Sequence, residues 1–411
     1  MTYSPDGSSC CSSTGSSLGV EPLASTSPPV DPLFERFASW QRERHAYARE
    51  WKARSGGKVL GYFCTYLPEE VAYAAGVLPV RILGSHEPQD VSDPHIFAMF
   101  CPFCRDCLAQ GLKGRYEYLD GIAIAQSCLH VRQAFSSWQQ HVPVSFSYYL
   151  PFPHGVQSRR AQPYLAAEIA AFGTAVEQWS GRAIDDAALR SAAETYNENR
   201  RLLRQLYDLR RSSPPALTGV EAMQVVLSSQ LVDKAAHSQA LAELLPRLTG
   251  RSPVKRDDVR LMIVGSENDN LPFLQMVESL GAVVVVDDHC SGTRYFWNQA
   301  VLDDDLPGSL ATRYLDRPAC PSKDWPTRSR IPHVLELASE WNVKGAILIQ
   351  EKFCDPHELD IPAITNALAA AGIPILFLEL DVTVPEGQLR TRVEAFLEML
   401  RQEDIFDEVP R

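Results

Sequence analysis

The feature that most constrains this chain is a series of short apolar runs, each long enough for one buried strand and separated from the next by a stretch with helical spacing. The first series lies at residues 58–63, 78–83, 121–125 and 142–146, and the second at residues 259–264, 282–286, 345–349 and 375–380. Short apolar runs that alternate with helices are typical of parallel sheets covered by helices. The sequence therefore predicts an α/β fold with two flavodoxin-like or Rossmann-like parallel-sheet domains.

The stretch between the two series has a different pattern. Residues 160–250 carry long helical patterns and almost no strand signal. At the start of the chain, residues 1–30 are rich in Ser, Gly and Pro, with too few apolar side chains to offset the entropy lost on ordering. We therefore predict a disordered tail at 1–30, an N-terminal α/β domain at 31–155, a helical subdomain at 156–254 inserted between the sheet domains, and a C-terminal α/β domain at 255–411.

Composition and charge exclude several classes of protein. The formal net charge is −12 and the chain has no Lys/Arg-rich block, which argues against nucleic acid as a partner. No apolar run approaches the roughly 18 residues that a membrane span needs. The polar, Ser-rich start does not resemble a secretory signal peptide. We therefore expect a cytoplasmic protein that does not act on nucleic acid or at a membrane.

The ten cysteines are placed in a way that points to a site. A large chain without a secretory signal is expected to keep its thiols reduced. Cysteines follow several of the predicted strands closely, namely Cys64, Cys128, Cys290 and Cys354, while Cys101, Cys104 and Cys107 form a Cys-x-x-Cys-x-x-Cys segment. Sites in parallel sheets lie beyond the carboxyl ends of the strands. The alternative for any one of these cysteines is a small buried hydrophobe.

Spacing alone leaves the kind of metal site open. Cys101 and Cys104 supply one close pair for zinc, but no second such pair exists, so His95 or His130 would have to complete the set. The Cys-x-x-Cys-x-x-Cys segment also looks like a bacterial ferredoxin run, although the Cys-Pro sequel of that run is missing.

A set of dispersed motifs is more specific than any single spacing. In the first half they are the segment from Gly61 to Glu70, Cys101-Pro102 with Arg105, Leu119-Asp120-Gly121, and Cys128. In the second half they are the segment from Asp287 to Phe296, Cys320-Pro321, the segment from Lys352 to Pro356, and the segment from Gln388 to Phe396. In this order they resemble the benzoyl-CoA reductase/2-hydroxyacyl-CoA dehydratase family, which includes 2-hydroxyglutaryl-CoA dehydratase, over about residues 33 to 400.

The resemblance implies a function and a cofactor. It implies a [4Fe-4S] cluster on three cysteines from separate segments, which by motif are Cys101, Cys128 and Cys354. Such a subunit receives a low-potential electron from an ATP-hydrolysing iron–sulfur activator and passes it to a CoA thioester, giving a ketyl radical. Dehydratases then lose water, whereas benzoyl-CoA reductases reduce the aromatic ring. The chain has no G-x-x-x-x-G-K-[ST] loop, which agrees with an ATPase on another polypeptide.

The resemblance also leaves alternatives open. A branch of the family carries a double-cubane [8Fe-9S] cluster on more thiolates, for which Cys64, Cys290 and Cys320 are the additional candidates. A third possibility is a non-catalytic electron-relay subunit that pairs with a catalytic paralogue. The partner is therefore a sister family subunit in a heterodimer or a second copy of this chain in a homodimer. Cys104 and Cys107 are either helix residues or further ligands.

Three other residues are weak candidates for catalysis. Glu69 and Glu70 begin a predicted helix, where carboxylates interact favourably with the helix dipole, and one of them could instead act as a base on the substrate. His289 precedes Cys290 and could donate a proton, since histidine titrates near neutral pH. The simpler interpretation is that it is a loop histidine.

Overall fold

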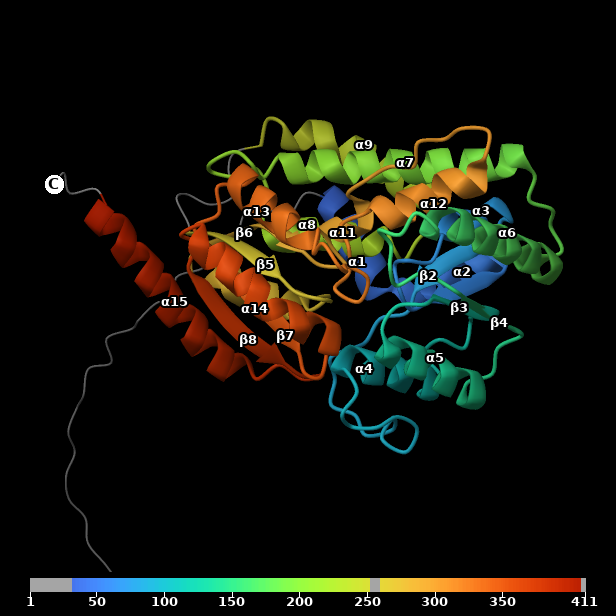
Figure 1. Ribbon diagram of the computed structural model, residues 1–411, viewed down its shortest axis with the longest axis horizontal. Coiled ribbons are helices and arrows are strands. Elements are labelled where there is room, and N and C mark those ends of the chain that lie inside the picture. Colours follow the sequence, from blue (N-terminus) through green and yellow to red (C-terminus); the bar gives the residue numbers. More distant parts are fainter. Residues whose placement is uncertain (1–31, 252–258, 408–411) are drawn as a thin grey trace, which may run out of the picture. The chain divides into compact units, whose positions relative to one another are not determined.

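The computed structural model describes residues 32–251 and 259–407, and these residues form two four-stranded sheets (Figure 1). The strands of the first sheet are β1 (Val59–Tyr62), β2 (Leu78–Arg81), β3 (Gly121–Ala125) and β4 (Phe146–Leu150). Those of the second are β5 (Val259–Val264), β6 (Ala282–Asp288), β7 (Gly345–Glu351) and β8 (Ile375–Leu380). All paired strands are parallel, so the predicted fold class is confirmed.

The two sheets have the same strand order. It is β2-β1-β3-β4 in the first and β6-β5-β7-β8 in the second, which matches the start of the flavodoxin-like order. In such a sheet the chain reverses its direction of winding between the two central strands, and a crevice opens beyond their carboxyl ends. The two crevices are therefore expected beyond β1 and β3 and beyond β5 and β7.

Helices fill the connections between strands. Those before β4 are α1 (Pro32–Arg42), α2 (Arg44–Ser55), α3 (Glu69–Ala74), α4 (Pro102–Leu112) and α5 (Leu129–His141). Those between β4 and β5 are α6 (Ala161–Ser180), α7 (Asp186–Asp208), α8 (Gly219–Ser228) and α9 (Lys234–Leu248). The remaining ones are α10 (Leu271–Ser279), α11 (Thr293–Phe296), α12 (Leu306–Asp316), α13 (Arg330–Glu340), α14 (Asp355–Ala370) and α15 (Glu386–Asp407).

The middle of the chain is helical, as its pattern predicts. Helix α7 packs against α9, and α6 packs against α12 from the later part of the chain (Figure 1). Helix α6 also contacts β4, and α8 contacts β6, so the inserted helices lie against both sheets. The described residues from Pro32 onward belong to one compact unit, and the division at residues 155 and 254 stays a prediction. The predicted tail at 1–30 lies outside the described residues.

One strand lies later than predicted. The apolar run at 142–146 leads into β4 rather than forming it, because α5 continues to His141 and Val142 caps its end. Pro143 follows and has no amide hydrogen to donate to a neighbouring strand. Pairing with β3 begins only at Phe146, opposite Gly121.

Three hydrophobic cores hold the sheets, and the central one is shared. Side chains on one face of β3, including Ile122 and Ile124, belong to the same core as Leu261 and Ile263 of β5. We call this set the shared core. Because it joins one face of each sheet, it brings the carboxyl ends of both sheets into one region of the molecule. No helix in the described ranges has the length and apolar character to cross a membrane.

Candidate functional site

Seven cysteines line one cavity of about 80 Å³, which we call the thiol cavity. They are Cys64, Cys101, Cys104, Cys128, Cys290, Cys320 and Cys354. All eight cysteines in the described part of the chain are free thiols. The eighth, Cys107, points elsewhere, since its Sγ donates a hydrogen bond to the carbonyl oxygen of Ile82 at 3.5 Å. Cys10 and Cys11 lie outside the described residues.

The topology explains why residues so far apart in the sequence meet. Cys64 follows β1 and Cys128 follows β3, which are the two central strands of the first sheet. Cys354 follows β7, a central strand of the second sheet, and Cys290 follows β6. Both crevices predicted from the strand order therefore open into the thiol cavity. The structure brings all six predicted ligand cysteines together there.

The three cysteines predicted to hold a [4Fe-4S] cluster share a local position. Cys101 is the N-cap of α4, Cys128 the N-cap of α5 and Cys354 the N-cap of α14. A helix N-terminus presents free amide hydrogens and the positive end of the helix dipole, both of which favour a thiolate. The pKa is lowered for Cys101 and Cys128, whereas the hydrogen bond to Cys101 and burial raise the pKa of Cys354.

Cys104 lies among these three thiols. Hydrogen bonds from the thiols of Cys104 and Cys354 lower the pKa of Cys101 well below its ordinary value. A hydrogen bond from Cys104 likewise lowers the pKa of Cys128. Burial raises the pKa of Cys104 itself. The four sulfurs are therefore neighbours, and Cys104 is a better candidate for a further ligand than Cys107.

The other three cysteines of the cavity have polar neighbours. Cys290 donates a hydrogen bond from Sγ to Glu267 Oε2 at 2.6 Å, and Arg81 Nη2 donates to the same carboxylate at 2.5 Å. The backbone nitrogen of Cys320 donates to the hydroxyl of Tyr66 at 3.0 Å. Burial raises the pKa of Cys64 and of Cys290. In the absence of a metal, these two thiols are held in their protonated form.

The donor set distinguishes between kinds of metal. In the described ranges no three His, Cys, Asp or Glu side chains converge on one point as a single ion requires. His130 does not complete a zinc set, because its Nδ1 accepts a hydrogen bond from the backbone nitrogen of Cys101 at 3.1 Å and its Nε2 lies 3.5 Å from Asp355 Oδ2. An iron–sulfur cluster needs thiolates spread over several irons rather than gathered on one. Seven thiols around one partly apolar cavity fit such a cluster.

The predicted carboxylate candidates lie elsewhere. Glu69 and Glu70 are buried at the start of α3 and do not line the thiol cavity. Glu70 forms an ion pair with Arg200 and accepts a hydrogen bond from Tyr314 at 2.8 Å. Glu69 Oε1 accepts a hydrogen bond from Tyr295 at 3.2 Å. Their surroundings are those of a buried charge network under α3.

His289 is fully buried and also lies off the cavity lining. Burial lowers its pKa to about 4, so the ring is neutral at pH 7. Neither ring nitrogen has a hydrogen-bond partner among the described residues. This environment gives His289 no contact with the thiols through which it could donate a proton.

Several lining residues are not among those predicted from the sequence, and two of them follow a central strand. Ser266 and Glu267 come two and three residues after β5 and line the thiol cavity. The sequence does carry a signal for them, because β5 is one of the predicted strands and a site is expected beyond its carboxyl end. The placement of cysteines does not point to them, because Ser and Glu rather than Cys follow this central strand.

Comparison with known proteins finds relatives along most of the chain. The family model of the 2-hydroxyglutaryl-CoA dehydratase D-component matches residues 64–400. The (R)-phenyllactyl-CoA dehydratase beta subunit of Clostridium sporogenes is 25% identical over 90% of this chain and 99% of the relative. A benzoyl-CoA reductase subunit of Thauera aromatica is 26% identical over 80% of this chain and 87% of the relative. The beta subunit of (R)-2-hydroxyglutaryl-CoA dehydratase from Acidaminococcus fermentans is 25% identical over 90% of this chain and 100% of the relative.

The family match begins at Cys64 and extends beyond Cys354, so it includes all seven cysteines of the thiol cavity. The resemblance seen in the motifs is thereby confirmed. This chain belongs to the 2-hydroxyglutaryl-CoA dehydratase D-component family.

Proposed function

We propose that this chain is the [4Fe-4S] subunit of a CoA-thioester dehydratase or reductase. The observation that supports it is the gathering of seven thiols in one cavity beyond the central strands of both sheets. The relatives agree with this enzyme type, since they are named as subunits of dehydratases and of a reductase for CoA thioesters. In this proposal the enzyme acts in the cytoplasm.

Cys101, Cys128 and Cys354 would hold the cluster. Each lies at a helix N-terminus, where the first-turn amides stabilise a thiolate. When bound, the cluster would supply one-electron transfer and an iron that polarises a carbonyl oxygen. With only three cysteine ligands, one iron of the cluster would have no protein ligand and would be free to contact the carbonyl oxygen.

The chain itself gives the cavity its shape and excludes water from it. Phe63, Phe103 and Val131 form apolar parts of its lining, together with Pro321 and Pro356. Apolar walls exclude water, which strengthens electrostatic interactions inside and protects a reactive radical from side reactions. The substrate in this proposal is a CoA thioester whose acyl end reaches these walls.

The electron comes from a partner. We propose a separate ATP-hydrolysing iron–sulfur activator as the donor, in agreement with the absence of a phosphate-binding loop motif in the sequence. The relatives are each named as one subunit of a larger enzyme, two of them as the beta subunit, which supports a heterodimer with a sister family subunit. A homodimer is the alternative assembly.

A second candidate is favoured by a specific observation. Cys64, Cys290 and Cys320 lie on the same cavity as the other thiols. A double-cubane [8Fe-9S] cluster uses more thiolates than a single cubane, and six cysteines from six segments are available here. In this alternative the protein reduces small molecules rather than CoA thioesters.

Iron and acid-labile sulfide per chain, measured on anaerobically purified protein, test the proposal. About four irons in the wild type, lost in Cys354→Ser and kept in Cys290→Ser, would support the single cluster. About eight irons, lost in both variants, would favour the double cubane. Cys107→Ser is the matched control, because Cys107 is buried but points away from the cavity. A wild-type protein without iron after anaerobic reconstitution would overturn both.

A further inference from the structure

Two further cavities lie beside the thiol cavity, and the three share walls. The smaller, which we call the water cavity, has a volume of about 10 Å³ and shares Phe103 and Glu267 with the thiol cavity. The larger, which we call the outer cavity, has a volume of about 470 Å³ and shares Gly84, His86 and Asp269 with the water cavity. A volume of about 10–15 Å³ holds one water molecule. The water cavity is therefore large enough for one water molecule and too small for an acyl chain.

The two ends of this series differ in character. The outer cavity is lined in part by Glu87 and Glu386, which are exposed, so it opens to solvent. The water cavity is lined by the buried carboxylates of Glu267, Asp269 and Glu351. Glu267 is 5% exposed, and its Oε1 atom has no hydrogen-bond partner among the described residues. A buried carboxylate oxygen without a partner, on the wall of a water-sized cavity, is a place where a water molecule donates a hydrogen bond.

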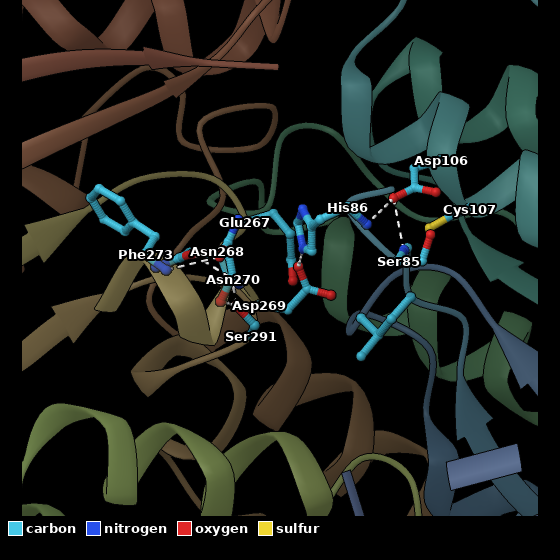
Figure 2. Close-up of polar contacts among 12 residues, drawn as sticks. Ser85, His86, Asp106, Cys107, Glu267, Asn268, Asp269, Asn270, Phe273 and Ser291 are labelled. Atoms are coloured by element: carbon cyan, nitrogen blue, oxygen red, sulfur yellow. Dashed lines mark hydrogen bonds and ion pairs between the residues drawn. The ribbon is translucent and has the colours of Figure 1, made fainter. Parts of the chain in front are cut away.

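One ion pair separates the outer cavity from the water cavity. His86 Nε2 lies 2.6 Å from Asp269 Oδ1, and the His86 side chain is 32% exposed whereas that of Asp269 is 6% exposed. Figure 2 shows the imidazole ring beside Asp269 and the backbone nitrogen of His86 turned toward the Asp106 carboxylate. The His86 side chain is therefore partly exposed to solvent, while its Nε2 atom contacts a buried carboxylate.

Both partners of this pair are held in place by their own loops. The backbone nitrogens of Ser85 and His86 each donate to Asp106 Oδ2 at 2.8 Å, which fixes the loop after β2 (Figure 2). On the other side, Asn270 caps α10 by accepting from the backbone nitrogen of Phe273 at 2.9 Å. The pair thus joins the loop that follows β2 in the first sheet to the loop that follows β5 in the second.

We propose that His86 and Asp269 form the solvent end of a proton path that runs through the water cavity to the thiol cavity. The inference rests on the proposed function in its reductase form, because ring reduction consumes protons, whereas dehydration takes up none overall. His289 is fully buried and lies off the cavity lining, and the competing route is His130, whose Nε2 lies 3.5 Å from Oδ2 of the exposed Asp355.

Each step of the path conserves protons. Starting from the charged ring, His86 releases the proton on Nε2 to Asp269 Oδ1. The ring then turns, so that its unprotonated nitrogen faces solvent and takes up a proton from bulk water. Asp269 passes the released proton to the water in the water cavity, and that water, held by Glu267 Oε1, passes a proton on into the thiol cavity. Glu267 needs only to accept a hydrogen bond, so its charge does not change. The ring and the carboxylate return to their starting charges after each transfer.

The electrostatics around His86 support this role. Burial lowers the pKa of His86, but the Asp269 carboxylate outweighs it and raises that pKa to about 9. Asp106 on α4 and Glu351 at the end of β7 also face the ring and act in the same direction. Arg44 on α2 faces Asp269 and, with His86, lowers the pKa of that carboxyl. At neutral pH His86 is therefore charged and able to donate.

His86→Gln tests the path with proton uptake as a readout besides turnover. The reduced protein is mixed with benzoyl-CoA, whose ring reduction consumes protons, and with a pH-indicator dye in weak buffer, and the rate of proton uptake is followed. We expect His86→Gln to slow proton uptake and turnover by about 10²-fold, with iron content unchanged and with recovery on adding imidazole. Wild-type turnover should fall above about pH 9, and the turnover of His86→Gln should not show this decrease.

Two further variants guard against an effect of misfolding. Val384 lines both the water cavity and the outer cavity, so Val384→Phe should block the path without removing a titratable group, and imidazole should not restore it. His141→Gln, at the exposed end of α5, is the matched control and should change nothing. Full proton uptake in both His86→Gln and Val384→Phe, with normal iron and turnover, would overturn the path and leave the proposed function intact. A wild-type protein without iron would overturn both.

Discussion

The Glu70 carboxylate is an ion fully removed from water, and its neighbours determine what it can do. Burial opposes its charge, but Arg200 outweighs burial and lowers the pKa of Glu70 below its ordinary value. We therefore expect a role in stability rather than in proton transfer. Glu70→Gln should lower the free energy of unfolding by about 3–5 kcal/mol, because Arg200 would be left buried without a countercharge. Urea unfolding at pH 7 measures this change.

Glu194→Gln is the control for that experiment. Glu194 is exposed on α7, and its replacement should change the free energy of unfolding by less than about 0.5 kcal/mol. If Glu70→Gln instead unfolds like the wild type and loses only turnover, Glu70 acts on the substrate and the structural role assigned to it is wrong.

At the scale of elements, the His86–Asp269 pair links the loop after β2 to the loop after β5. The pKa of His86 is about 9 in the folded chain, against an ordinary value of 6.5. A group whose pKa is raised by folding stabilises the fold fully below its unfolded pKa, and that contribution is lost as the pH rises through the folded value. Between pH 6.5 and 9.5 we expect the wild type to lose about 1–3 kcal/mol that His86→Gln does not lose.

Urea unfolding at the two pH values, on both proteins, measures this difference. Asp269→Asn is the second variant, since it removes the countercharge and leaves the imidazole in place. An equal pH dependence in the wild type and in both variants would show that the pair does not hold the two loops together.

The same elements show what a sequence can predict. Seven of the eight strands were expected where they occur, because their apolar runs are bounded by turn residues and helical spacing. The strand predicted at 142–146 lies later in the chain. Pro143 has no amide hydrogen to donate to a neighbouring strand, and helix α5 extends to His141. The meeting of Cys64 with Cys290 was expected only from the family resemblance, because strand patterns do not tell how the shared core sets one sheet against the other. The partner of His86 could not be predicted for the same reason.

At the scale of the whole molecule, the shared core joins the two halves. Ile122 and Ile124 of the first sheet and Leu261 and Ile263 of the second belong to one buried cluster. The alternate side chains of each strand face separate cores, such as Ala123 on the far side of the first sheet and Met262 on the far side of the second. The thiol cavity lies where both sheets end, so it keeps its form only if both halves stay folded together.

We therefore expect the two sheets to unfold in one transition. Pulsed hydrogen exchange in increasing urea, read by mass spectrometry, should give the same midpoint for peptides from β1 to β3 and from β5 to β7. Ile263→Ala should lower stability by about 2–5 kcal/mol and move both midpoints together, because the cavity opens in the shared core. Leu165→Ala removes apolar side-chain atoms from the core between α6 and the first sheet. It should also move both urea midpoints, although it lies outside the shared core. If β5 to β7 exchange at a urea concentration where β1 to β3 stay protected, the halves are independent, and the seven thiols are gathered by docking of two stable domains rather than by one cooperative fold.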